Sequence, residues 1–334
     1  MNYFKFELKR TVNNKKNKVL CLILLILLMF LILFSANLKS TNNFESLESD
    51  LELLITSSNK TLNSLKGDEA IPDDVKVDFK KDLESGLKLY NKQKEALQNK
   101  DLKLYHEIQL QVNQLAESNG EATDFSSEEN AYIKYVLNKG LDFEYSPRAQ
   151  LHSFGLVHEV LFPLLYSSLF YIVILLIGGI SIASDFENES MKLYKTPLFH
   201  KKNIVLTHFI SNTVTVSICY ISIVLFYIVG VGILNGFGSP NYPSGVFGLA
   251  LIDNWKIDLL HLFWGLLVII FIISFGILLS LLTRRSTLVV VIFAFITLGF
   301  DMLKNQDFMQ PYLEFFPMSY FEPISLLQGS FSLT

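Results

Sequence analysis

Polar side chains recur along one face of a long apolar stretch in the second half of the chain. Residues 203–252 contain no Asp, Glu, Lys or Arg, and the side of the helix opposite the polar face is Ile, Val and Leu. Polar groups left in hydrocarbon cost free energy, so this face should turn toward protein or toward a water-filled path. Two interpretations stay open, helix packing and a translocation surface. The residues are His208, Ser211, Asn212, Thr215, Cys219 and Ser222.

A second chemically distinctive stretch is the charged segment at residues 183–202, which lies between two long apolar runs. Its sequence is ASDFENESMKLYKTPLFHKK. A polar segment this short, which returns the chain to the membrane, must lie at one face of the bilayer as a loop or short helix. Its Lys residues place that face in the cytoplasm, because short loops rich in Lys and Arg stay inside. We interpret the segment as the contact through which a cytoplasmic motor moves the membrane part.

Catalytic and ion-coupling chemistry is missing from the sequence. There is no G-x-x-x-x-G-K-[ST], so any ATP, with its Mg²⁺, is expected to be hydrolysed by a partner chain. The centres of the apolar runs lack Asp, Glu, Lys and Arg, which argues against proton or sodium coupling. His208 and His261 lie near span ends and are interpreted as interfacial, and no His, Cys or Asp cluster of metal-ligand type is present. We expect a non-catalytic chain without a cofactor or metal.

The elements that position these residues are membrane spans. Hydrophobic residues make up 50% of the chain, and uncharged runs of membrane-spanning length recur. The predicted fold class is therefore all-α, a polytopic membrane helical bundle with a helical extracytoplasmic insertion between spans one and two. Spans are predicted at residues 19–38, 160–184, about 205–234, 259–283, and 286–300 with its flanks. Together, residues 156–303 hold spans two to five, with a cytoplasmic coupling loop at 185–203.

The N-terminus is basic and amphipathic. Residues 1–18 carry several Lys and Arg residues, with Phe4, Leu8 and Val12 spaced for one helical face. This pattern predicts a helix in the headgroup layer before span one, and a disordered basic leader is the alternative. A retained anchor is favoured over a cleaved signal peptide, because the apolar region is too long and the cleavage site is weak.

Residues 39–155 form a polar insertion that is extracytoplasmic if the N-terminus stays inside. Residues 37–159 hold 14 Lys or Arg and 22 Asp or Glu, so the acidity of the chain is concentrated there. Leu-rich periodicity predicts one helix over residues 44–65 and, after Pro72, a second that continues to about Leu115, giving an antiparallel hairpin. A capping box at residues 126–129 predicts a short helix ending near Gly140. The Leu stripes fit internal packing, or else a ligand groove.

The connections after span three follow from Gly, Pro and Arg residues. Gly236, Gly238, Pro240 and Pro243 predict an external turn region, and Arg284-Arg285 a tight cytoplasmic turn. Residues 304–334, with three Pro among aromatics, predict an external interfacial segment or short re-entrant helices.

The loop between spans two and three resembles the type-2 ATP-binding-cassette (ABC) transporter permease family. Its members often carry F-E-N-G-T-x-K, a few hydrophobic residues, and then Pro and a basic cluster. Here the phrase reads FENESMK over residues 186–192, followed by Pro197 and Lys201-Lys202. The amphipathic N-terminus, the insertion after span one and the Pro-rich segment after span five also agree. The resemblance covers nearly the whole chain.

Two departures from the family pattern stand out. Glu189 replaces the usual Gly, which changes the expected bend at that position. Family members generally have six spans and end in the cytoplasm, whereas this sequence stops at Thr334, where a sixth span should begin. We expect a truncated sequence, with a five-span variant as the alternative.

The resemblance implies two permease chains, identical or related, joined to two cytoplasmic ABC ATPase subunits. The phrase would belong to a coupling helix that docks in a cleft of the ATPase, and closure of the motors would tilt spans two and three. In this chain, charged docking contacts would come from Glu187, Glu189, Lys192 and Lys195. Apolar or turn contacts would come from Phe186, Met191, Leu193, Tyr194 and Pro197.

Three functional hypotheses follow. The first is an exporter subunit for an amphiphilic substrate such as an antimicrobial peptide, a lipid-like compound or a drug. The second is a mechanical transmitter that moves the external helices to regulate an envelope process without transport. The third is an anchor or receptor that binds no ATPase. Abundant Lys and Asn, few Cys and an external helical insertion fit a multi-pass protein of a Gram-positive plasma membrane.

Overall fold

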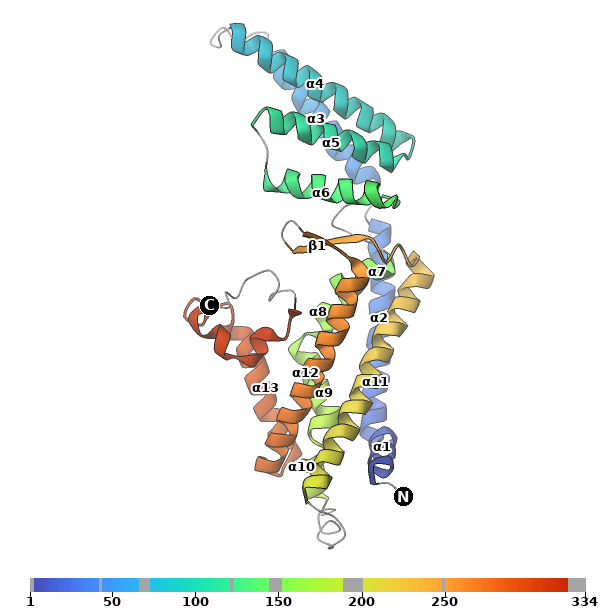
Figure 1. Cartoon of the computed structure of the whole chain (residues 1–334), viewed down its shortest axis with the longest axis vertical. Helices are drawn as coiled ribbons and strands as arrows, with labels where there is room; N and C mark the ends of the chain where they lie inside the picture. The colour runs from blue at the N-terminus through green and yellow to red at the C-terminus, as the bar shows by residue number, and fades with distance from the viewer. Residues whose placement is uncertain are drawn as a thin grey trace. The chain divides into compact units, whose positions relative to one another are not determined.

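The computed structural model describes residues 3–41, 44–65, 73–120, 123–143, 152–188, 201–247 and 250–323. The chain divides into two compact units. The membrane unit contains residues 1–35, 152–238 and 255–334, and the insertion unit contains residues 36–151 and 239–254. Both units are built mainly from helices, which confirms the predicted all-α class (Figure 1).

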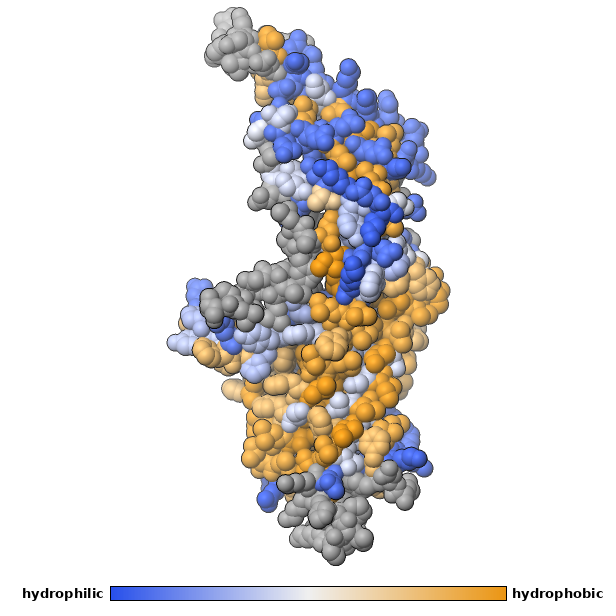
Figure 2. All heavy atoms as spheres, viewed as in Figure 1, coloured by the Kyte–Doolittle hydropathy of each residue, from blue (hydrophilic) through white to orange (hydrophobic). Residues whose placement is uncertain are grey.

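Four helices among the described residues are long and apolar enough to cross a bilayer. Their outward side chains are largely Leu, Ile, Val and Phe, and Figure 2 shows these hydrophobic residues covering the membrane unit. A bilayer solvates such a surface, provided that the backbone is hydrogen-bonded within helices. The helices are α2 (Lys15–Thr41), α11 (Lys201–Asn235), α12 (Asn254–Thr283) and α13 (Ser286–Leu303).

The region predicted as span two is a pair of helices joined at a bend, and we call this pair the broken span. Its two halves, Ser153–Leu165 and Ser168–Gly179, meet at a bend of 69°. The break has a local cause, because the Ser167 side chain caps the new helix by accepting a hydrogen bond from the Phe170 N–H at 3.3 Å. In order, the elements are α7 (Ser153–Leu156), the π-helical η1 (Val157–Leu161), α8 (Phe162–Leu165), α9 (Ser168–Ile174), the π-helical η2 (Leu175–Gly179) and α10 (Ser181–Glu187).

Glycines bring the broken span into close contact with α12. A Cβ built on Gly276 would lie 2.8 Å from the Gly179 Cα, which is closer than a Cβ approaches a non-bonded carbon in real structures. The Ser280 hydroxyl donates to the Gly179 carbonyl oxygen at 2.8 Å across the same contact. Small residues therefore allow these two backbones to meet.

The chain after α13 folds back onto the membrane unit as two short 3₁₀ helices, η4 (Gln310–Phe315) and η5 (Pro317–Tyr320). The indole N–H of Trp264 on α12 donates to the Tyr320 carbonyl oxygen at 2.8 Å. The Phe321 ring packs edge-on against Tyr171 and Phe271. Residues 304–323 of the predicted interfacial segment are therefore ordered against the bundle, and residues 324–334 lie outside the described part.

The insertion unit contains α3 (Phe44–Leu65), α4 (Asp73–Gln98), α5 (Leu102–Ser118) and α6 (Asp124–Lys139). The sequence predicted that the second helix continues to about Leu115, but it ends at Gln98. Lys100 has a φ of 58°, and the Asp101 side chain caps α5 by accepting from the Leu104 N–H at 3.0 Å. The capping box of α6 lies at Thr123 and Ser126, one turn earlier than predicted, and its C-cap is Gly140, as predicted.

A β-hairpin completes the insertion unit. Strands β1 (Pro243–Phe247) and β2 (Ala250–Asp253) pair antiparallel in a region predicted only as a turn. Tyr242, directly before β1, packs in the core of α6 beside Ile133 and Val136, and its hydroxyl accepts from the Tyr132 hydroxyl at 2.6 Å. The segment that connects predicted spans three and four thus shares a hydrophobic core with α5 and α6, which lie between predicted spans one and two.

Candidate functional site

The N-terminal helix α1 (Tyr3–Asn13) turns its polar side toward the protein. Glu7 and Thr11, four residues apart on one face, are buried, whereas Phe4 and Leu8 are half-buried and Val12 is exposed. The apolar residues that predicted an interfacial helix are therefore left for lipid. The polar face contacts α11 and the end of the broken span.

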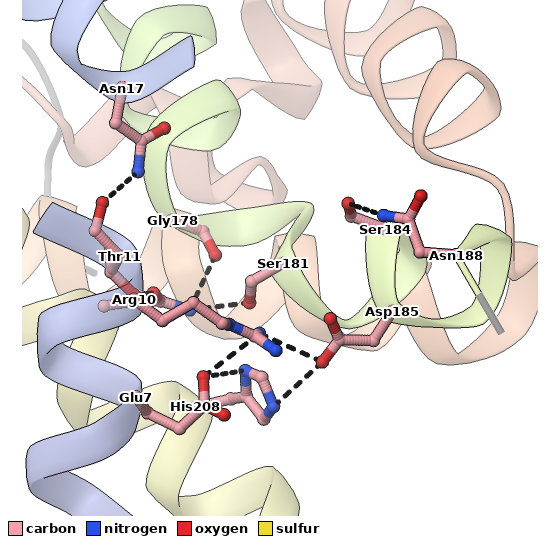
Figure 3. Close-up of polar contacts among 11 residues, drawn as sticks. Glu7, Arg10, Thr11, Asn17, Gly178, Ser181, Ser184, Asp185, Asn188 and His208 are labelled. Atoms are coloured by element: carbon pink, nitrogen blue, oxygen red, sulfur yellow. Dashed lines mark hydrogen bonds and ion pairs between the residues drawn. The ribbon is translucent and has the colours of Figure 1, made fainter. Parts of the chain in front are cut away.

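Four ionisable residues meet where α1, α10 and α11 join. A guanidinium nitrogen of Arg10 lies 3.0 Å from Glu7 Oε2 and 3.0 Å from Asp185 Oδ2. The His208 imidazole lies on the other side, with Nε2 3.3 Å from Asp185 Oδ2 and Nδ1 3.9 Å from Glu7 Oε2 (Figure 3). We call Glu7, Arg10, Asp185 and His208 the charge cluster. It links an N-terminal residue to one 175 positions later.

Asp185 is 5% exposed, and burial and nearby charge shift the pKa of its carboxyl group in opposite directions. Burial alone raises the pKa of its carboxyl group. The hydrogen bond from His208 and the charge and hydrogen bond of Arg10 outweigh that effect, so the pKa lies below its ordinary value. The carboxylate therefore stays ionised at neutral pH. Removing Arg10 would leave a buried carboxylate whose charge is poorly compensated.

Asn212 joins three elements beside the charge cluster. Its amide nitrogen donates to the Gly178 carbonyl oxygen at 3.0 Å and to the Ser181 hydroxyl at 2.6 Å. Its amide oxygen accepts from the Thr11 hydroxyl at 3.2 Å. Every one of these contacts lies inside the protein, so Asn212 acts here as a packing residue between α1, α11 and the broken span.

The other residues of the predicted polar face divide into two groups. His208, Ser211 and Thr215 are buried like Asn212, and the Thr215 hydroxyl donates to the Ser211 carbonyl oxygen at 2.9 Å. Ser222 is exposed and donates to the Ile218 carbonyl oxygen at 2.8 Å. The buried side of α11 shifts along the helix to Tyr220, Val224, Tyr227 and Val231, so the polar face is buried only over its first two turns.

The carbonyl groups of η2 receive hydrogen bonds from three different helices. Lys16 of α2 donates to Leu176 at 2.6 Å, Asn212 of α11 to Gly178 at 3.0 Å, and Ser280 of α12 to Gly179 at 2.8 Å. A π-helical turn shifts the backbone pairing by one residue, so its carbonyl groups are open to side-chain donors. The π-helical turn η2 therefore joins the broken span to α2, α11 and α12.

The first two residues of the predicted coupling set contact the turn between α12 and α13. The Glu187 carboxylate accepts from the Ser286 N–H at 2.8 Å and from the Ser286 hydroxyl. The Arg284 guanidinium carbon lies 5.5 Å from the centre of the Phe186 ring. The remaining predicted residues lie outside the described part of the chain; they are Glu189, Met191, Lys192, Leu193, Tyr194, Lys195 and Pro197.

The sequence reasoning missed Glu7, Arg10, Thr11 and Asp185. One signal was present, because Glu7 and Thr11 are four residues apart and therefore share a helical face. Their partners are far along the chain and could not be read from spacing. His261, predicted to be interfacial, is also buried, with its ring stacked on Phe162 at 4.5 Å. The described residues contain no group of three His, Cys, Asp or Glu that could hold a metal ion.

A protein-family model described as an ABC-2 family transporter protein matches residues 1–326 of the chain. The chain belongs to the ABC-2 transporter family. This match confirms the resemblance inferred from the charged segment. No curated protein and no solved structure matches this ABC-2 protein.

Membership of the ABC-2 family makes this chain a membrane protein of an ABC transporter, and the apolar helices agree with a multi-pass arrangement. Members of this family are membrane transport subunits that are generally not catalytic themselves, and the family implies an ABC ATPase as partner. The sites described in this ABC-2 protein are contacts between helices.

Proposed function

We propose that the protein is the permease subunit of an ABC exporter that moves an amphiphilic substrate, such as an antimicrobial peptide, a lipid-like compound or a drug. A separate ABC ATPase would bind ATP and Mg²⁺ and hydrolyse the ATP. A second copy of this chain, or a related permease, would complete the membrane part. We also propose that a face of the third span lines the translocation path. The contacts of Asn212 described above are packing contacts and do not by themselves require this role. The residues of this face are His208, Ser211, Asn212, Thr215 and Ser222.

One observation carries the proposal. At one end of the membrane unit, Arg10 of α1 contacts Asp185 of α10, and the next residues, Phe186 and Glu187, contact the α12–α13 turn. The basic N-terminal helix, the start of the charged segment and Arg284-Arg285 thus gather in one place. Short basic elements stay in the cytoplasm, which supports a cytoplasmic N-terminus, an external insertion unit and a plasma-membrane location.

The contacts also supply a mechanism for coupling. The charged segment continues directly from Glu187, so a force on docked residues 188–200 would reach α10 first. From there the Asp185 contacts lead to α1 and α11, and the Glu187 contact leads to α13. Closure of the ATPases would therefore move several helices as a group between two packings.

The test is purification of the protein from native membranes, followed by identification of a Walker-motif ATPase bound to it. The complex in proteoliposomes should hydrolyse ATP faster with a transported amphiphile than without. The double variant Glu187→Lys with Lys192→Glu should still bind the ATPase but lose this stimulation, because a cation at position 187 would face the Ser286 N–H. Full stimulation in that double variant, or the absence of any ATPase, would overturn the proposal.

The compact insertion unit supports a second candidate, a transmitter that regulates an envelope process without transport. The chain crosses between the two units four times, after residues 35, 151, 238 and 254. Deleting residues 44–118 removes α3 to α5 but keeps α6 with the β-hairpin that shares its core. An exporter should lose little ATP-driven transport in this variant, whereas a transmitter should lose its whole effect on cells challenged with cationic peptides.

A further inference from the structure

A pocket of about 250 Å³ lies in the membrane unit between α9, the C-terminal end of α13, and the η4–η5 segment. It is at the end of α13 opposite Ser286, the residue that Glu187 contacts. The pocket is lined by both aromatic and charged residues. Its principal lining residues are Tyr166, Tyr171, Phe300, Phe321, Asp301 and Lys304.

Contacts from two elements hold the Asp301 carboxylate in the pocket lining. The Ser168 hydroxyl of α9 bonds one oxygen of the Asp301 carboxylate, and Lys304 Nζ lies 3.1 Å from the other. Glu322 also lines the pocket and is a charged neighbour of the Tyr166 and Tyr171 hydroxyls. With two carboxylates and one ammonium group, the lining favours a cation.

The Tyr171 hydroxyl is a polar group left without a hydrogen bond. Tyr171 is 5% exposed and lines the pocket, and its hydroxyl has no hydrogen-bond partner among the described residues. Buried hydroxyls in proteins are normally hydrogen-bonded, because an unpaired one loses the hydrogen bonds that water gave it. By contrast, the neighbouring Tyr166 hydroxyl donates to the His261 carbonyl oxygen at 2.8 Å. A ligand atom in the pocket would supply the partner that Tyr171 lacks.

The volume and the lining residues of the pocket together indicate the chemical class of ligand that it could bind. Sites that enclose a drug-sized molecule are usually about 300–1,000 Å³, so this pocket fits a head group with its tail outside, in lipid. Aromatic faces and carboxylates both attract an ammonium ion. A primary ammonium group also donates N–H bonds, which the oxygen of a tyrosine hydroxyl accepts.

We propose that this pocket binds the primary ammonium head group of a cationic amphiphile. The inference rests on the proposed export function, because it names the substrate class for which the pocket would be a binding site. Asp301 and Glu322 provide the negative charge, the Tyr171 hydroxyl accepts an N–H, and the aromatic rings cover the group. Its position at the far end of α13 from Glu187 lets movement of that helix alter the pocket.

Binding can be measured without ATP or an ATPase, so its failure is distinct from failure of the proposed function. The protein carries two Trp residues, Trp255 and Trp264, and Trp264 bonds the segment that forms one wall of the pocket. Trp255→Phe leaves Trp264 as the single fluorescent reporter, in nanodiscs of zwitterionic lipid. The probes are dodecylammonium, dodecyltrimethylammonium and dodecyl sulfate, which share one chain length, and empty nanodiscs correct for partition into lipid.

Dodecylammonium should bind most tightly, dodecyltrimethylammonium more weakly because it lacks N–H donors, and dodecyl sulfate weakest. Tyr171→Phe removes no internal hydrogen bond, and it should weaken dodecylammonium binding about tenfold while leaving the trimethylammonium probe unchanged. The matched control is Tyr312→Phe, since Tyr312 is on η4 but is exposed and does not line the pocket. Asp301→Asn should weaken both cationic probes. Equal affinity for the three probes, or unchanged binding in Tyr171→Phe, would overturn the proposal.

Discussion

The carboxylate of Glu187 caps the N-terminal end of α13 by accepting hydrogen bonds from both the N–H and the hydroxyl of Ser286, which is 99 positions later in the chain. A helix start exposes N–H groups with a partial positive charge, so an external carboxylate is a favourable partner. The first residues of the charged segment are thus bonded to another span. Any movement of the segment must either carry α13 with it or break this contact.

Glu187→Ala should lower the stability of the purified protein by about 1 kcal/mol, the usual contribution of an N-terminal cap. Ser286→Ala removes the hydroxyl partner and keeps the N–H, so its effect should be smaller. In a double-mutant cycle followed by thermal unfolding in detergent, the two effects should not add, because both changes remove parts of one contact. Strictly additive losses would show that the cap does not form.

Asn212→Leu should destabilise the protein by about 2 kcal/mol, because the Thr11 hydroxyl loses its acceptor and the Gly178 carbonyl oxygen loses its donor inside the protein. The matched control is Ser222→Leu on the same helix, where the side chain is exposed and the cost should be near zero. Thermal unfolding gives the stabilities, and transport by Asn212→Leu with Thr215→Leu tests the translocation role. Unchanged transport in that double variant would show that these third-span residues do not line the translocation path.

Asp185→Asn should lower stability in a way that depends on pH. The folded-state pKa of Asp185 is lowered, so its stabilising effect is fully present above the unfolded value of about 3.9 and disappears as the pH falls through the lower folded value. The difference in melting temperature between the wild-type protein and the variant should be constant from pH 8 to 5 and shrink below about pH 4. Three ionisable groups of the charge cluster lie around Asp185, namely Arg10, Glu7 and His208. A difference that already shrinks above about pH 5 would contradict the assignment to Asp185.

Gly276→Ala should destabilise the protein by about 1–3 kcal/mol, because the added methyl group would overlap the backbone of Gly179 and the Leu175 side chain. Gly299→Ala is the matched control, since it lies in α13 with no atom within 4 Å of the position of its Cβ. There, Ala should raise stability by about 0.5–1 kcal/mol through its higher helix propensity. Equal effects of the two substitutions on thermal unfolding would contradict the close approach of the broken span and α12.

The sequence by itself was enough for the helical class, the four long apolar helices and the family. Each depends on local information, since a span needs only an uncharged run such as residues 259–283. The end of α6 is equally local, because Gly140 adopts the left-handed conformation that terminates a helix. The basic turn at Arg284-Arg285 was predicted for the same reason, from the residues that form it.

The tertiary structure decided which polar groups meet. Asp185 and Arg10 are 175 positions apart, and Thr11 and Asn212 are 201 apart, so no spacing rule connects them. The bend at Ser167 depends on a single helix cap, and the end of α4 before Lys100 depends on that residue's left-handed conformation. The periodicity of apolar residues does not reveal either feature. A buried charge or amide is stable only beside its partner, and which partner is near depends on the packing of helices and not on the order of residues.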